Sequence, residues 1–175
     1  MRQKNVDTVD DLFRLALAAE TEARLFYRGL RALFAPAPAA ASFWDRMYED
    51  ETVHCRELLL IYAALPAAVR RSPADPEVLE KARRNARMPL RKDFRSIRTL
   101  DDAFEIAHRL ETSEVMVVFA FIRGKYVPLA RRRSFTLSVL EEHLQRIMDF
   151  PQRFGDPAAR RMIIARRRGL RPQPM

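Results

Sequence analysis

The sequence predicts an all-α protein built as a bundle of four long helices, and three observations support this. The chain has four glycines in 175 residues, and its prolines separate long stretches rich in Ala, Leu, Arg and Glu, which favour helices. In those stretches apolar residues recur at the spacing of one helix face. Two stretches open with a threonine followed three residues later by an aspartate, at Thr8 and Asp11 and again at Thr99 and Asp102, which is the pattern of a capping box.

The helices are expected in order along the chain, each ended by a proline or glycine signal or by a loop. We expect them over residues 8–34, 40–65, 99–124 and 134–151. A connection of a few residues makes helices one and two antiparallel neighbours, and a modest connection does the same for helices three and four.

A longer connection, residues 66–98, lies between the two pairs. In it, Asp75-Pro76-Glu77 predicts one short helix, because an aspartate cap is followed by proline in the first turn. Two antiparallel helix pairs joined by one long crossover connection form the ferritin-like arrangement of a four-helix bundle. We therefore expect residues 1–152 to form a ferritin-like four-helix bundle and residues 153–175 to form a basic C-terminal tail.

The formal net charge of +9 is unevenly distributed, and part of it lies in the tail. Such a charge suggests nucleic acid or another polyanion as a partner of the tail, and a solvated arginine-rich surface is the plain alternative. The tail arginines are Arg153, Arg160, Arg161, Arg166, Arg167, Arg168 and Arg171.

Cysteine content and hydropathy narrow the class further. The single cysteine, Cys55, excludes an intramolecular disulfide and a four-cysteine metal site within this chain. No apolar run approaches the ~20 residues needed to span a bilayer. The first ten residues are polar and charged, without an apolar signal region. We expect a cytoplasmic protein with no membrane partner.

Ionisable residues interrupt the apolar face of every predicted helix, and the pair Glu51 and His54 is the most informative. A spacing of three places both on one face, the face that also carries Trp44 and Met47. A buried carboxylate and imidazole cost several kcal/mol unless they are compensated, and a metal ion compensates them well. The corresponding interruptions on the other helices are Glu20 on the first, Glu111 on the third with His108 and Glu114 three residues to either side, and His143 on the fourth.

Each interruption also has a simpler explanation when taken alone. Glu20 can pair with an arginine at the boundary of the core, and His143 can bond a backbone carbonyl. Glu114 and Glu142 can be solvated, and Tyr27 can be a packing residue. Their occurrence at compatible depth on four helices favours a metal site.

Taken together, these segments resemble the rubrerythrin branch of the ferritin-like superfamily over about residues 8–150. The segments that carry the resemblance are Glu20 with Tyr27 seven residues on, Glu51-Thr52-Val53-His54, Glu111 with Glu114, and Leu140-Glu141-Glu142-His143-Leu144. The resemblance implies a di-iron site, with manganese as the alternative metal. The activity that it implies is reduction of peroxide, or oxidation of ferrous iron by dioxygen or peroxide.

The resemblance also implies a role for each residue. The metal ligands would be Glu20, Glu51, Glu111 and His143. His54 and Glu114 would be ligands that exchange with the charge of the metal, and Glu142 is a further candidate metal ligand on the fourth helix. Tyr27 would orient a ligand carboxylate through its hydroxyl, and His108 would be a substitute ligand or a residue that supports one. A homodimer is also expected from the resemblance. A separate electron-donor protein is expected because the chain has no rubredoxin-like cysteine set.

One departure from the family pattern lies on the fourth helix. Val139 and Leu140 stand where the family has a bridging glutamate one turn before the histidine. This leaves three readings open: a di-metal site with altered ligands, a single-metal site, and a degenerate site. In the last two, the bundle would be a structural or interaction protein that acts through its basic tail.

Overall fold

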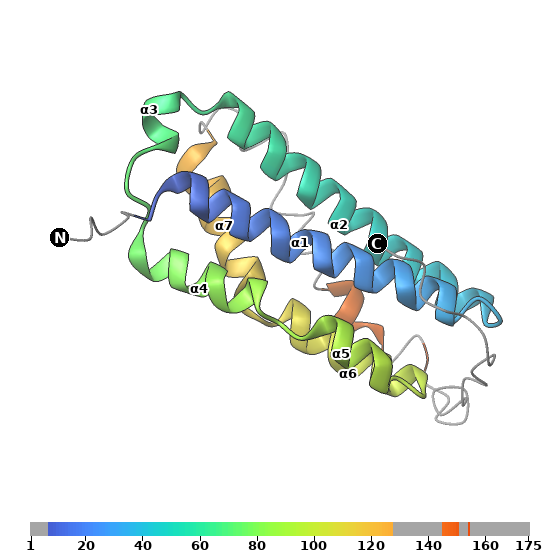
Figure 1. The fold of residues 1–175 in the computed structure, drawn as a ribbon. Helices are drawn as coiled ribbons and strands as arrows, with labels where there is room; N and C mark the ends of the chain where they lie inside the picture. The colour runs from blue at the N-terminus through green and yellow to red at the C-terminus, as the bar shows by residue number, and fades with distance from the viewer. Residues whose placement is uncertain (1–6, 128–144, 151–153, 155–175) are drawn as a thin grey trace.

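The computed structural model describes residues 7–127, 145–150 and 154, and this part of the chain is α-helical, without a β-strand (Figure 1). The all-α prediction is confirmed for these residues. The helices are α1 Val9–Leu33, α2 Pro38–Ala64, α3 Ala67–Arg70, α4 Pro76–Ala86, α5 Leu90–Ser96, α6 Leu100–Glu111 and α7 Glu114–Tyr126.

The first two helices form an antiparallel pair, as predicted, and lie side by side in Figure 1. The capping box that opens α1 is present. The Thr8 hydroxyl accepts a hydrogen bond from the Asp11 amide at 3.3 Å, and the Asp11 carboxylate accepts one from the Thr8 amide at 3.1 Å. Proline in the first turn opens α2.

The prediction of one continuous third helix over residues 99–124 is wrong. The chain forms two helices, α6 and α7, which are separated at Thr112 and Ser113. The Thr112 hydroxyl donates to the His108 carbonyl at 2.7 Å, and the Ser113 hydroxyl accepts from the Val115 amide at 3.3 Å. These hydroxyls end one helix and cap the next, because serine and threonine compete with the helical backbone bonds.

The long connection contains more helix than the sequence predicts. The predicted cap is present, since Asp75 Oδ1 accepts from the amides of Glu77 and Val78, each at 3.1 Å. Two further helices, α3 and α5, flank α4. Helix α4 packs against both α1 and α7, and α5 packs against α1 and α6 (Figure 1). The connection therefore forms part of the helix packing.

The predicted fourth helix lies mostly outside the described residues, as does the tail 153–175 apart from Phe154. Residues 145–148 are helical. Arg146 donates from Nη1 to Oδ2 of Asp50, and Phe150 is fully buried. These contacts attach the segment to α2.

Buried apolar residues form two clusters at opposite ends of the helices. We call them the Trp44 cluster, which includes Ala23, Phe43, Trp44, Met47 and Phe150, and the Phe13 cluster, which includes Phe13, Ala16, Leu58, Phe119 and Ile122. On α1, Glu20 lies between Ala16 and Ala23. On α2, Glu51 and His54 lie between Met47 and Leu58. The ionisable residues thus form a layer across the middle of the core.

Candidate metal centre

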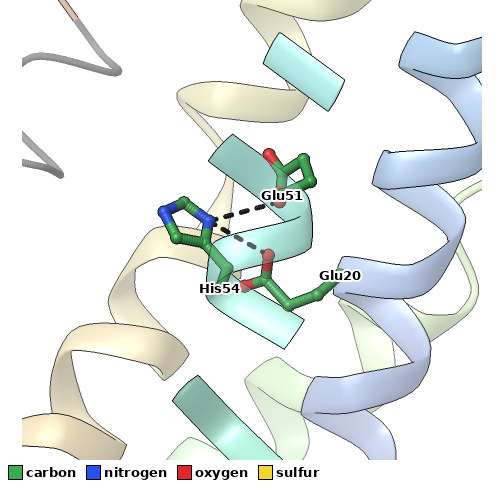
Figure 2. Close-up of side chains that lie close together, drawn as sticks. All are labelled: Glu20, Glu51 and His54. Carbon is green, nitrogen blue, oxygen red and sulfur yellow. Dashed lines mark hydrogen bonds and ion pairs between the residues drawn. The ribbon is translucent and has the colours of Figure 1, made fainter. Parts of the chain in front are cut away.

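Three ionisable side chains meet in this middle layer, and Figure 2 shows that Glu20 comes from α1 while Glu51 and His54 come from α2. None is more than 2% exposed. Nδ1 of His54 lies 3.2 Å from Oε2 of Glu51 and 3.4 Å from Oε2 of Glu20. One ligand atom from each residue lies within 4.8 Å of the others. The structure therefore brings together three residues that the sequence singles out as ligands.

The surroundings of His54 are apolar on one side and acidic on the other. Its ring packs on Phe119 of α7, with centroids 4.7 Å apart. Burial alone lowers the pKa of His54, but the nearby carboxylate of Glu20, with the charges of Glu111 and Asp50, raises it more. The resulting pKa lies above the ordinary value of 6.5. In the metal-free protein, a proton on His54 offsets part of the surrounding negative charge.

Oε2 of Glu20 is fully buried, and within the described chain no hydrogen-bond donor is well aligned with it. Nδ1 of His54 lies 3.4 Å from this oxygen. A buried carboxylate oxygen without a good donor costs free energy, on the order of 1–3 kcal/mol or more. A cation at this position would supply the missing partner. This is the feature of the cluster that best fits a metal.

Tyr27 and Glu111 form a second buried contact, between α1 and the end of α6. The Tyr27 hydroxyl donates a hydrogen bond to Oε1 of Glu111, and the Tyr27 ring stacks on Trp44 with centroids 6.0 Å apart. Burial, with the charges of Glu111 and Glu51, raises the pKa of Tyr27 well above its ordinary value, so the hydroxyl stays protonated. Tyr27 thus holds a carboxylate through its hydroxyl, the kind of contact that the sequence analysis expects.

The remaining predicted site residues are Glu114, His108, Glu142 and His143. Glu114 is the first residue of α7, so the break in the helix separates it from Glu111. His108 is half-buried, its ring lies 5.7 Å from that of Phe104, and among the described residues its ring nitrogens make no hydrogen bond. Glu142 and His143 lie outside the described residues.

Two ion pairs near the centre are not predicted from the sequence. Glu57 Oε1 lies 2.7 Å from Nε of Arg123, and both side chains are largely buried. Burial raises the pKa of Glu57, and the neighbouring Arg123 opposes this only in part. The second pair joins Asp50 to Arg146. A sequence signal for the first does exist, because Arg123 interrupts an otherwise apolar helix and Glu57 lies one turn beyond His54.

The donor set has a defined chemistry. Two carboxylates and one imidazole suit iron or manganese better than a soft, thiolate-seeking metal. Glu51 and His54 are held on one helix and Glu20 on its antiparallel neighbour, so the three donors converge without a loop. The residues present therefore fit a divalent metal ion.

Comparison of the chain with protein-family models, with curated proteins and with solved structures finds no match. Among the described residues, no helix is long and apolar enough to cross a membrane.

Proposed function

We propose that the protein binds iron or manganese at Glu20, Glu51 and His54 and acts as a rubrerythrin-like oxidoreductase. The observation that carries the proposal is the convergence of these three buried side chains within 4.8 Å. Two ionised carboxylates would leave the group with a net negative charge even when the imidazole is protonated. A buried net charge is costly, and a bound cation compensates it.

The proposed architecture is a ferritin-like four-helix bundle made of α1, α2, the α6–α7 segment and a helix that ends near residue 150. The contact of Arg146 with Asp50, and the burial of Ile147 and Phe150, support placing this last helix beside α2. Glu142 and His143 precede Arg146 by about one helical turn. They are accordingly the proposed source of further ligands for a second ion, together with Glu111 and Glu114.

A bound iron or manganese would supply redox chemistry by alternating between divalent and trivalent states. Glu20, Glu51 and His54 would hold the ion, and Tyr27 would fix the orientation of Glu111. The two apolar clusters on either side of the site exclude bulk water from it. The oxidant would be peroxide or dioxygen, and electrons would come from a separate donor protein.

A single-metal site is the second candidate, and a specific observation favours it. The described donor set holds three ligand atoms in one group, which suits one ion. Glu111 is engaged by Tyr27. In this reading, the ion stabilises the bundle and redox turnover is not required.

Metal analysis of protein purified without chelators tests the proposal. Inductively coupled plasma mass spectrometry should find one or two irons or manganeses per chain. Glu51→Gln and His54→Gln keep the side-chain size and should lose the metal, whereas Glu105→Gln, on the exposed face of α6, should retain it. In the di-metal reading, where Glu111 is a ligand of the second ion, Tyr27→Phe should weaken binding of that ion by about 10- to 100-fold.

The count of metals separates the two candidates. Two ions per chain, one of them lost in His143→Ala, support the di-metal reading, and one ion unaffected by His143→Ala supports the single-metal reading. Absence of metal after anaerobic loading with ferrous iron and with Mn²⁺ would rule out both.

A further inference from the structure

An open groove of about 780 Å³ lies between α1 and the junction of α4 with α5. These elements run side by side in Figure 1. Small side chains on both walls, among them Ala18 and Thr21 on α1 and Ala86 and Pro89 across from them, leave the space open. Two of its lining residues, Leu17 and Met88, pack against the Phe13 and Trp44 clusters, and none of its lining residues belongs to the site described above.

Thr21 links the groove to the ionisable layer. It lines the groove, and its Oγ1 lies 3.9 Å from Sγ of Cys55. Thr21 directly follows Glu20 in the chain, and Cys55 directly follows His54. Cys55 is buried, and its thiol lies close enough to Glu20 and Glu51 for both charges to act on it. A contact between two small side chains, Thr21 and Cys55, therefore joins the groove to residues that adjoin Glu20 and His54 in the chain.

The groove carries an excess of positive charge. Its walls hold Arg14, Arg91 and Lys92 against one carboxylate, Glu22. Arg91 donates two hydrogen bonds to Glu22, at 2.9 and 3.2 Å, and Arg14 donates one to Asp11 at 3.0 Å, so both arginines are already paired with carboxylates. Lys92 is exposed and forms no ion pair with any described residue. A cleft lined by one sign of charge concentrates small ligands of the opposite sign and repels those of the same sign.

We propose that this groove is the route by which a small oxidant reaches the metal site, with Thr21 as the gate between them. Its charge favours an anionic or uncharged oxidant, such as a peroxide, over a ferrous ion. This inference rests on the proposed function, because an oxidant needs a route to this site only if a metal is bound there. It also favours the reduction of peroxide over the oxidation of ferrous iron, because a ferrous ion would approach against the charge of Lys92.

The thiol of Cys55 is a built-in probe of this route, because it is the only cysteine in the chain. We would compare two methanethiosulfonate reagents of similar size, one carrying a sulfonate and one a trimethylammonium group, at low salt and pH near 9. Burial, above all, raises the pKa of Cys55 to about 11, so labelling by either reagent is slow. The thiolate fraction is the same for both reagents and therefore cancels in the ratio of the two labelling rates. The anionic reagent should react about tenfold faster, and 0.5 M salt should reduce this preference.

Variants of the groove make the test specific. Replacing Arg91 and Lys92 together by glutamate should reverse the preference, whereas Lys125→Glu, a change of an exposed residue on α7, should not. Thr21→Ala opens the gate and should accelerate both reagents severalfold, while Thr21→Val keeps its size and should not.

Three results would overturn the proposal: no labelling of Cys55, equal rates for the two reagents, or a preference insensitive to Arg91 and Lys92. None of these measurements requires bound metal. A failure of the route is therefore distinguishable from a failure of the metal site, which metal analysis reports separately.

Discussion

Nδ1 of His54 lies within 3.4 Å of carboxylates from two helices, so the protonation state of His54 changes the charge of the metal centre. The local spacing with Glu51 is readable in the sequence, since residues three apart share a helix face. The contact with Glu20 requires α1 and α2 to meet at the right depth, which the short loop between them permits. The hydrogen bond from Tyr27 to Glu111 joins residues 84 positions apart, and no local pattern contains it.

The raised pKa of His54 predicts how metal affinity depends on pH. Because the folded pKa lies above 6.5, protonation stabilises the metal-free protein below pH 6.5, and this contribution is lost as pH rises through the folded pKa. A metal needs the neutral imidazole, so its affinity has the opposite dependence. Titration calorimetry with Mn²⁺ should show affinity falling toward pH 6, by up to about tenfold per pH unit for one displaced proton. Affinity that does not change between pH 6 and 8 would contradict this.

Of the described helices, α1, α4, α6 and α7 begin at a residue whose side chain caps the first turn, and α6 ends just before Thr112, whose hydroxyl bonds a backbone carbonyl. The caps at Thr8, Asp75 and Thr99 are all recognisable in the sequence and are all present. The break at Thr112 and Ser113 is also encoded locally, but the apolar periodicity continues through it and predicts one long helix. This break turns Glu111 into a helix end.

The two described helical glycines offer a matched test of how closely α1 and α5 pack. A Cβ on Gly29 would lie 2.8 Å from the Phe94 ring, whereas a Cβ on Gly124 would meet nothing within 4 Å. Gly124→Ala should therefore stabilise the protein by up to about 1 kcal/mol through helix propensity. Gly29→Ala should lose this gain, because Phe94 must move away from its edge-on contact with Phe26. Urea unfolding of both variants measures the difference, and equal stabilisation would mean that α5 does not press against α1.

The molecule as a whole is organised as two apolar clusters with an ionisable layer between them. The clusters provide the hydrophobic free energy of folding, and the layer concentrates the functional groups at the same depth on neighbouring helices. Residues 145–150 complete the Trp44 cluster, since Phe150 stacks on Phe104 with centroids 4.6 Å apart.

This packing makes Phe150 important for global stability. Phe150→Ala removes a fully buried ring and should destabilise the protein by about 3–5 kcal/mol. Met148, two residues away and 53% exposed, is the matched control, and Met148→Ala should change stability by less than about 0.5 kcal/mol. Chemical unfolding followed by circular dichroism measures both. Similar effects of the two changes would show that this segment does not complete the core.

The sequence by itself determined the all-α class, the starts of the capped helices and the inward positions of Glu20, Glu51 and His54. All of these depend on interactions within one or two helical turns, where spacing and capping chemistry are sufficient. Only the tertiary structure decided which inward residues meet. Three contacts depend on the rotation and depth of one helix against another: Tyr27 with Glu111, Glu57 with Arg123, and Thr21 with Cys55. Packing across the whole core sets this rotation and depth, so no single segment of the sequence encodes them.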